Sequence, residues 1–287
     1  MPLDFVVPMA LAYLMFTVGL DVRPGDFRAL AAAPAVVLAG FAAQMLGLPL
    51  IAVAIALVVG LPGDLAVGLI ILAAAPGGVT SGFVTAMVRG DVALSVVLTV
   101  GTSLAAIVSV PLVVGAALAH FTGVETALAL PLGRTVAAIF VTVIVPLTAA
   151  LIVARRWPRW TGRARQPLRR IGVAVFLALI GVAIAGEWRT IAAEAPRIGL
   201  AVVLLNLATM ALGYGIGRLA GASPARARAI LIECGLQNVA LALLVAGPIL
   251  RRPDLGGVAT VYALVMNLSA LALILALNRA QAAKAAD

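Results

Sequence analysis

Apolar segments, each about as long as a helix that crosses a lipid bilayer, occupy most of this chain. Hydrophobic residues make up 64% of the 287 residues and charged residues only 11%, a balance that excludes a water-soluble domain. The segments are rich in Ala, Leu, Val and Gly and do not alternate at period two, so they predict helices and not barrel strands. We therefore expect an all-α polytopic membrane protein, with residues 1–287 forming a single transmembrane unit.

The apolar pattern predicts nine transmembrane helices. Their approximate bounds are 3–20, 29–60, 65–88, 92–119, 135–154, 171–185, 198–217, 229–250 and 256–277. With nine spans, 15 of the 20 Lys and Arg residues fall on the side of the C-terminus, seven of them in the loop 155–170. Because basic residues gather in cytoplasmic loops, we expect a multi-pass protein of the cell's inner (plasma) membrane, with its N-terminus outside and its C-terminus in the cytoplasm. The net charge of +9 thus indicates how the chain is oriented in the membrane, and we expect no nucleic-acid partner.

Two of the nine spans are interrupted by helix-weakening residues. Pro76-Gly-Gly78 breaks the third span, and Glu233-Cys-Gly-Leu-Gln-Asn238 breaks the eighth. Five spans separate the two breaks, so the broken helices run in opposite directions. This arrangement is typical of an inverted repeat in a secondary transporter, whose discontinuous helices build an ion site.

Glu233 is the only acidic residue inside a long apolar segment. A carboxylate at membrane depth costs about 2.5 kcal/mol or more, so such a residue is a functional candidate. The other polar groups at this depth supply neutral oxygens, which together with one carboxylate suit a hard cation such as Na⁺. The alternative is a structural acid paired with Arg228. No motif of a metalloprotease, a phosphate-binding loop or a serine hydrolase is present, so no enzymatic activity is expected.

Several motifs together resemble the bile acid:sodium symporter family, and the chain is similar to a bacterial member of it. The motifs are Phe16-Thr-Val-Gly-Leu, Arg23-Pro-Gly-Asp-Phe, Pro76-Gly-Gly with Ser81, Arg89-Gly-Asp-Val-Ala-Leu-Ser95, Thr99 and Glu233-x-Gly-x-Gln-Asn238. The resemblance implies Na⁺-coupled uptake of an organic anion, which is a bile-acid-like molecule or a small carboxylate. It also implies a panel domain and a core domain, with two discontinuous helices that cross in the core. On this basis the core comprises approximately 65–119 and 198–277 with part of 29–60, and the panel approximately 1–28 and 131–185.

The resemblance also assigns residues to two Na⁺ sites and to the substrate. The first Na⁺ site would use Ser81, Ser95, Thr99 and Glu233. The second would use Gln44, Glu233 and Gln237 with the backbone carbonyls of Cys234 and Leu236. Asn238, Thr80, Ser81 and Val79 would lie near the substrate.

Two departures from the family pattern affect these assignments, and one of them is Val79, which replaces a Thr expected near the substrate. Where the family commonly reads Gly-Gly-Thr-Ala-Ser-Asn, this chain has Gly77-Gly-Val-Thr-Ser-Gly82, so an Asn that ligates the first Na⁺ is missing. The number of bound ions, one or two, therefore stays open. Two other functions also stay open: proton-coupled anion transport with Glu233 as the carrier, and a membrane ligand sensor that does not transport. We expect a monomer whose partners are a small organic anion and the lipid bilayer.

Overall fold

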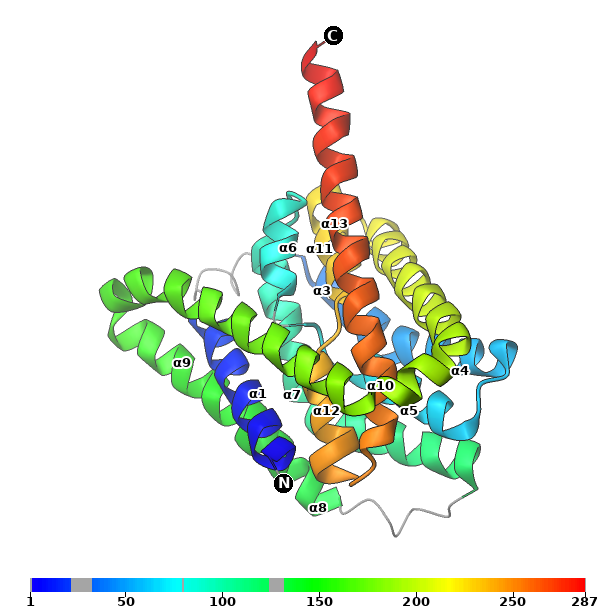
Figure 1. The fold of residues 1–287 in the computed structure, drawn as a ribbon. Helices are drawn as coiled ribbons and strands as arrows, with labels where there is room; N and C mark the ends of the chain where they lie inside the picture. Colours follow the sequence, from blue (N-terminus) through cyan, green and yellow to red (C-terminus); the bar gives the residue numbers. More distant parts are fainter. Residues whose placement is uncertain (1, 22–32, 79, 124–131, 287) are drawn as a thin grey trace.

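A computed structural model describes residues 2–21, 33–78, 80–123 and 132–286, and within these ranges the chain is helical with no strand longer than one isolated bridge (Figure 1). The helices of the first half are α1 (Pro2–Asp21), α3 (Pro34–Ala42), α4 (Leu48–Val59), α5 (Gly63–Ala74), α6 (Ser81–Met87) and α7 (Val92–Thr122). The helices of the second half are α8 (Leu132–Ile139), α9 (Val145–Arg156), α10 (Pro158–Leu219), α11 (Pro224–Gly235), α12 (Val239–Leu244) and α13 (Gly256–Ala286).

Three short π-helical segments connect helices that would otherwise be continuous. They are η1 (Ala43–Gly47), η2 (Phe140–Ile144) and η3 (Val245–Ile249). Pro49 and Pro146 stand two residues after the ends of the first two, and Pro248 lies inside the third. A proline lacks the amide hydrogen of the regular ladder and its ring crowds the preceding turn, which accounts for the wider turn at each place. A further short 3₁₀ helix, η4 (Pro253–Leu255), precedes α13.

Both predicted interruptions are confirmed, and the second is shorter than expected. The third predicted span is divided between α5 and α6, which end and begin on either side of residues 75–80. The eighth is divided between α11 and α12. However, α11 continues through Gly235, so Glu233 lies in the last turn of a helix and the break itself comprises only residues 236–238.

The predicted loop between the sixth and seventh spans is wrong, and the one between the fifth and sixth is reduced to Trp157, which separates α9 from α10. Residues 158–219 form one helix of 62 residues, α10, which includes most of the arginine-rich segment and the whole of 186–197. At 1.5 Å per residue this helix is about 93 Å long, roughly three times a bilayer core, so it is not a single span. Pro167 and Pro196 lie inside it, and its two ends point in different directions in Figure 1. Arg, Glu and Ala are good helix formers, so a polar stretch interrupts the hydropathy without interrupting the helix.

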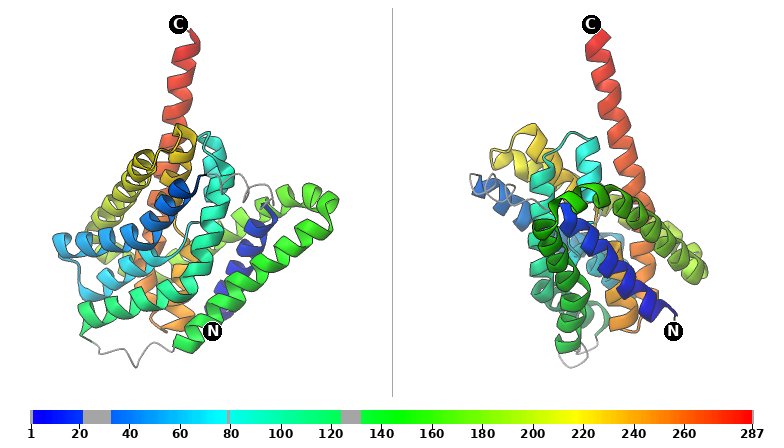
Figure 2. Two further views of the ribbon diagram at one scale, coloured as in Figure 1. Left: turned by 180° about the vertical axis from the view of Figure 1, so that it is seen from behind. Right: turned by 90° about the vertical axis from the view of Figure 1, so that its left-hand side faces the viewer.

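The helices pack into two neighbouring groups. Helix α1 lies against α9 and the first part of α10, and Figures 1 and 2 place these three together at one side of the molecule. On the other side α5 packs against α7, and α10 packs against α11 and α13. The last turns of α13 extend beyond the other helices (Figure 2).

Among the described residues, five helices are long and apolar enough to cross a membrane. They are Pro34–Val59, Val92–Thr122, Val136–Arg156, Ile198–Leu219 and Pro253–Leu277. Three shorter apolar helices, Phe5–Leu20, Gly63–Ala74 and Val239–Ile249, fall within predicted spans that are short or broken. The chain is therefore a polytopic helical membrane protein, while the count of nine and the inverted repeat stay predictions.

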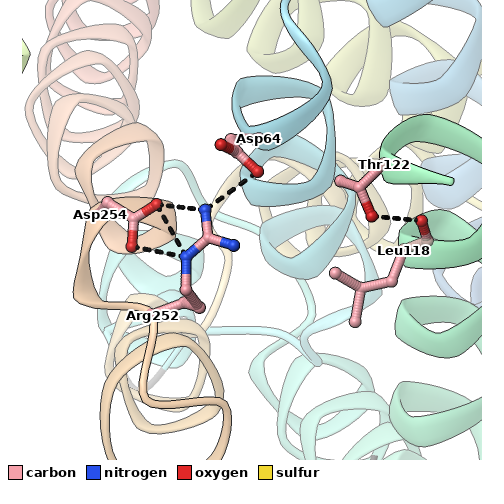
Figure 3. A network of polar contacts seen from close by, with 5 residues as sticks. All are labelled: Asp64, Leu118, Thr122, Arg252 and Asp254. Carbon is pink, nitrogen blue, oxygen red and sulfur yellow. Dashed lines mark hydrogen bonds and ion pairs between the residues drawn. The ribbon is translucent and has the colours of Figure 1, made fainter. Parts of the chain in front are cut away.

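Two ion pairs connect the broken helices. Each pair joins the turn that follows one broken helix to the start of the other. Asp91, which follows α6, lies 3.2 Å from Arg226 at the start of α11. Arg252, which follows η3, lies 2.9 Å from Asp64 at the start of α5 and 2.6 Å from its neighbour Asp254 (Figure 3). The hydrogen bonds that Arg252 donates to Asp254 and Asp64 raise its pKa above the usual value. Asp64 and Arg252 therefore share one side of the molecule.

Candidate ion-binding site at the paired helix breaks

The two helix breaks meet each other through their backbones. Gly77 and Gln237 form an antiparallel bridge, in which the amide of Gly78 donates to the carbonyl of Leu236 at 2.6 Å and the amide of Asn238 donates to the carbonyl of Pro76 at 2.9 Å. A side chain has no room at this contact, because a Cβ on Gly78 would lie 2.9 Å from the carbonyl oxygen of Gln237. Two segments about 160 residues apart in the chain are thus locked together at the centre of the site.

The carboxylate of Glu233 lies directly beside this pairing and is completely buried. Ser81 at the start of α6 and Ser95 on α7 both donate their hydroxyl hydrogens to its Oε1. The hydroxyl of Thr99, one turn after Ser95, lies 3.0 Å from Oε1 and 2.9 Å from Oε2. The four residues predicted for the first Na⁺ site are therefore brought together around one carboxylate.

No cation neutralises this carboxylate among the described residues. The alternative partner, Arg228, donates instead to the backbone carbonyl of Arg89 at 2.7 Å, and no salt bridge in the described part of the chain involves Glu233. The described residues also contain no group of three His, Cys, Asp or Glu side chains that could hold a metal. The donors are one carboxylate and several neutral oxygens, a set that suits a hard monovalent cation better than a transition metal.

Gly77 and Thr85 complete the surroundings of the carboxylate, and the sequence analysis did not identify either role. A Cβ on Gly77 would collide with Oε2 of Glu233, so the glycine allows the carboxylate to approach the first break. Thr85 is completely buried and donates to the hydroxyl of Ser95 at 3.4 Å. Thr85 stands four residues after Ser81 on the same helix face, a spacing that could have identified it.

The end of α11 carries the residues predicted for a second Na⁺ site. The side-chain nitrogen of Gln237 (Nε2) donates to the backbone carbonyl of Cys234 at 2.8 Å and to that of Glu233 at 3.3 Å. The side-chain oxygen of Gln237 has no hydrogen-bond partner. The carbonyl of Leu236 accepts from Gly78. Gln44 is buried on η1, which packs against α11, and neither of its side-chain polar atoms has a partner. Buried polar atoms without partners are rare, and such atoms often mark a ligand site.

The residues predicted near the substrate lie at the helix starts that follow the breaks. Asn238 caps α12 by accepting from the amide of Leu241 at 3.1 Å, and its side-chain nitrogen is buried without a partner. Thr80 is the residue before α6 and is partly exposed. Val79 lies outside the described residues. At Gly82, where the family commonly has Asn, a Cβ would lie 3.8 Å from its nearest neighbour, a methyl carbon of Val96, so a Cβ meets no steric obstacle there.

Comparison with known proteins bears on this site. The profile of the Sodium Bile acid symporter family matches residues 8–194. The chain belongs to this family. It is 31% identical over 238 residues to a protein of Oryza sativa subsp. japonica named probable sodium/metabolite cotransporter BASS2, chloroplastic. The alignment covers 83% of this chain and 55% of the rice protein.

Two other relatives in the family come from distant sources. The uncharacterized sodium-dependent transporter YocS of Bacillus subtilis is 29% identical over 82% of this chain and 71% of its own length. The human ileal sodium/bile acid cotransporter is 25% identical over 83% of this chain and 68% of its own length. These relatives of the symporter family are named as transporters and not as enzymes. The chain spans little more than half the length of the plant relatives.

Proposed function

We propose that this family member is a secondary active transporter that couples Na⁺ entry to the uptake of an organic anion. The observation that carries the proposal is the carboxylate of Glu233, which is buried without a cationic partner and is surrounded by the hydroxyls of Ser81, Ser95 and Thr99. An uncompensated charge in such a place is costly unless something positive binds there. The names of the relatives support Na⁺ as that cation.

The hydroxyl groups can serve the carboxylate and a cation together. Each hydroxyl has one hydrogen that it can donate to Glu233 and two lone pairs that can face a cation. At Ser95 one of these lone pairs accepts from Thr85, which leaves the other for a cation. In the proposed second site, the unpartnered oxygens of Gln44 and Gln237 join the carbonyls of Cys234 and Leu236. Glu233 is the shared ligand if two ions bind.

The proposed substrate site lies beside the breaks, at the starts of α6 and α12. Helix starts carry partial positive charge, which favours an anion. Asn238, with its unpartnered side-chain nitrogen, is the donor best placed to bind a carboxylate group. Na⁺ binding would hold the two breaks in the geometry that forms this site, and the core domain would then move against the panel domain to give alternating access.

The transport proposal is tested in proteoliposomes that contain the purified chain. An inward Na⁺ gradient should drive uptake of radiolabelled organic anions chosen by a thermal-shift screen of organic acids with and without Na⁺. Replacing the gradient with choline at equal ionic strength should abolish uptake, and so should Glu233→Gln. Normal uptake by Glu233→Gln would refute the proposed role of this carboxylate.

Proton coupling is the second candidate, and one departure from the family favours it. Gly82 replaces a side chain that would ligate the first Na⁺, while Glu233 still provides a carboxylate that can carry a proton. Uptake that follows an inward pH gradient in Na⁺-free buffer would establish this mechanism. Stabilisation by a ligand without any flux would instead indicate the non-transporting sensor.

A further inference from the structure

Asn206 and Tyr262 bind the same backbone carbonyl behind the second break. The side-chain nitrogen of Asn206 donates to the carbonyl oxygen of Gly235 at 2.9 Å, and the hydroxyl of Tyr262 donates to that oxygen at 2.9 Å as well. The two side chains are also 3.2 Å apart, nitrogen to oxygen. Both are completely buried, and they come from two different helices, α10 and α13.

We propose that Asn206 and Tyr262 are positioning residues that orient the carbonyls of the second break for ion binding, a role that rests on the proposed Na⁺ coupling. Helix α11 ends at Gly235, and Leu236 is extended, with φ −107° and ψ 99°. Carbonyls on either side of an extended residue point in different directions. When the carbonyl of Gly235 is held toward α10 and α13, the carbonyl of Leu236 faces the first break, where it accepts from Gly78 at 2.6 Å.

The carbonyl of Gly235 needs an external anchor because its residue is conformationally free. Glycine has access to more backbone conformations than any other residue, and at the end of a helix its carbonyl has no partner in the next turn. A larger residue at this position would require the side chain of Met210 to shift, because a Cβ would collide with it. Two donors from two helices occupy both lone pairs of the carbonyl and therefore define its direction, whereas one donor would satisfy it without fixing it.

Hydrogen bonds of this kind commonly control metal affinity from outside the ligand set. Partners that orient ligands typically change affinity by about 10- to 100-fold when they are removed. Here the anchored group is a neutral carbonyl next to the ligands and a second donor remains in each single variant. We therefore expect a smaller change, of about 3- to 10-fold in the half-saturating Na⁺ concentration.

The experiment measures Na⁺ binding by the full-length purified chain through its melting temperature. NaCl is titrated against choline chloride at constant ionic strength, and the half-saturating Na⁺ concentration is read from the shift. Tyr262→Phe and Asn206→Leu should each raise that concentration by about 3- to 10-fold. Thr260→Val is the matched control, because Thr260 is also buried on α13 but donates only to the carbonyl of Gly256 in its own helix, at 3.1 Å.

The outcomes separate a positioning role from a structural one. A structural role would lower the melting temperature at every Na⁺ concentration and leave the half-saturating concentration unchanged, and that result for Tyr262→Phe would overturn the inference. If Asn206→Leu does not fold, Tyr262→Phe decides the question alone, since it removes a single oxygen. If the unmodified chain itself shows no Na⁺-dependent shift, the proposed function fails and the inference fails with it.

Discussion

Thr99→Val isolates one hydroxyl of the carboxylate site, because valine has nearly the shape of threonine without its donor. The Thr99 hydroxyl lies 3.0 and 2.9 Å from the two oxygens of Glu233 and 3.1 Å from the carbonyl oxygen of Ser95, and its single hydrogen can serve only one of these acceptors at a time. A hydrogen bond to a charged group contributes about 1.5–3 kcal/mol to stability. Thr99→Val should therefore lower the free energy of unfolding by about that amount in Na⁺-free buffer.

Thr102→Val provides the matched comparison on the same helix. Thr102 is also completely buried, but its hydroxyl donates to neutral carbonyls of its own helix, at 2.8 Å to that of Leu98. Such a bond contributes about 0.5–1.5 kcal/mol, so the two variants should differ by about 1–2 kcal/mol. For a chain of this size the difference corresponds to roughly 2–8 °C in melting temperature.

The assay is thermal unfolding of both variants and of the unmodified chain in choline chloride, followed by a Na⁺ titration. Na⁺ should stabilise Thr102→Val as it stabilises the unmodified chain. Thr99→Val should respond only at higher Na⁺ concentration, because it lacks one oxygen ligand. Equal melting temperatures for the two variants, with equal responses to Na⁺, would refute the charged hydrogen bond and the ligand role together.

Three further changes test other parts of the site. Gly77→Ala should abolish Na⁺-dependent stabilisation and uptake, because the added methyl would displace the Glu233 carboxylate; an active alanine variant would contradict this. Gly82→Asn should lower the half-saturating Na⁺ concentration, since a Cβ meets no steric obstacle beside Val96 and the Asn side chain adds an oxygen ligand; an unchanged or higher value in the same titration would exclude that role. Arg252→Gln should lower the free energy of unfolding by no more than about 1 kcal/mol, because the ion pairs of Arg252 are part-exposed. This loss of stability should be smaller at high than at low choline chloride concentration, and a loss that is independent of salt would indicate packing instead.

The residues of the site could be predicted from the sequence to different extents. Glu233 was identifiable because a carboxylate in an apolar segment is rare, and Ser95 and Thr99 because they belong to the motifs that resemble the symporter family. The helix breaks were identifiable because Pro76 and the glycines beside it disfavour a helix locally. By contrast, the hydrogen bond from Tyr262 to Gly235 ends on a backbone carbonyl. Every residue has such a carbonyl, so the sequence does not indicate which one Tyr262 contacts.

The course of α10 shows the limit of hydropathy as a guide to helix ends. Charged residues at 186–197 predicted a loop, but hydropathy reports where a segment meets water and not where its backbone hydrogen bonds stop. Helix formers such as Arg, Glu and Ala continue the helix through that stretch. The predicted ends at the breaks were more accurate, because proline and glycine act on the backbone itself.

The sequence by itself determined the class of protein, the family, the two helix breaks and the hydroxyl residues that gather around Glu233, because each of these follows from local composition or motif. Only the tertiary structure decided that the breaks pair through Gly77 and Gln237, that Arg228 lies away from the carboxylate, and which donors hold the carbonyl of Gly235. Those contacts join segments far apart in the chain. Their geometry depends on how whole helices pack, which no single segment specifies.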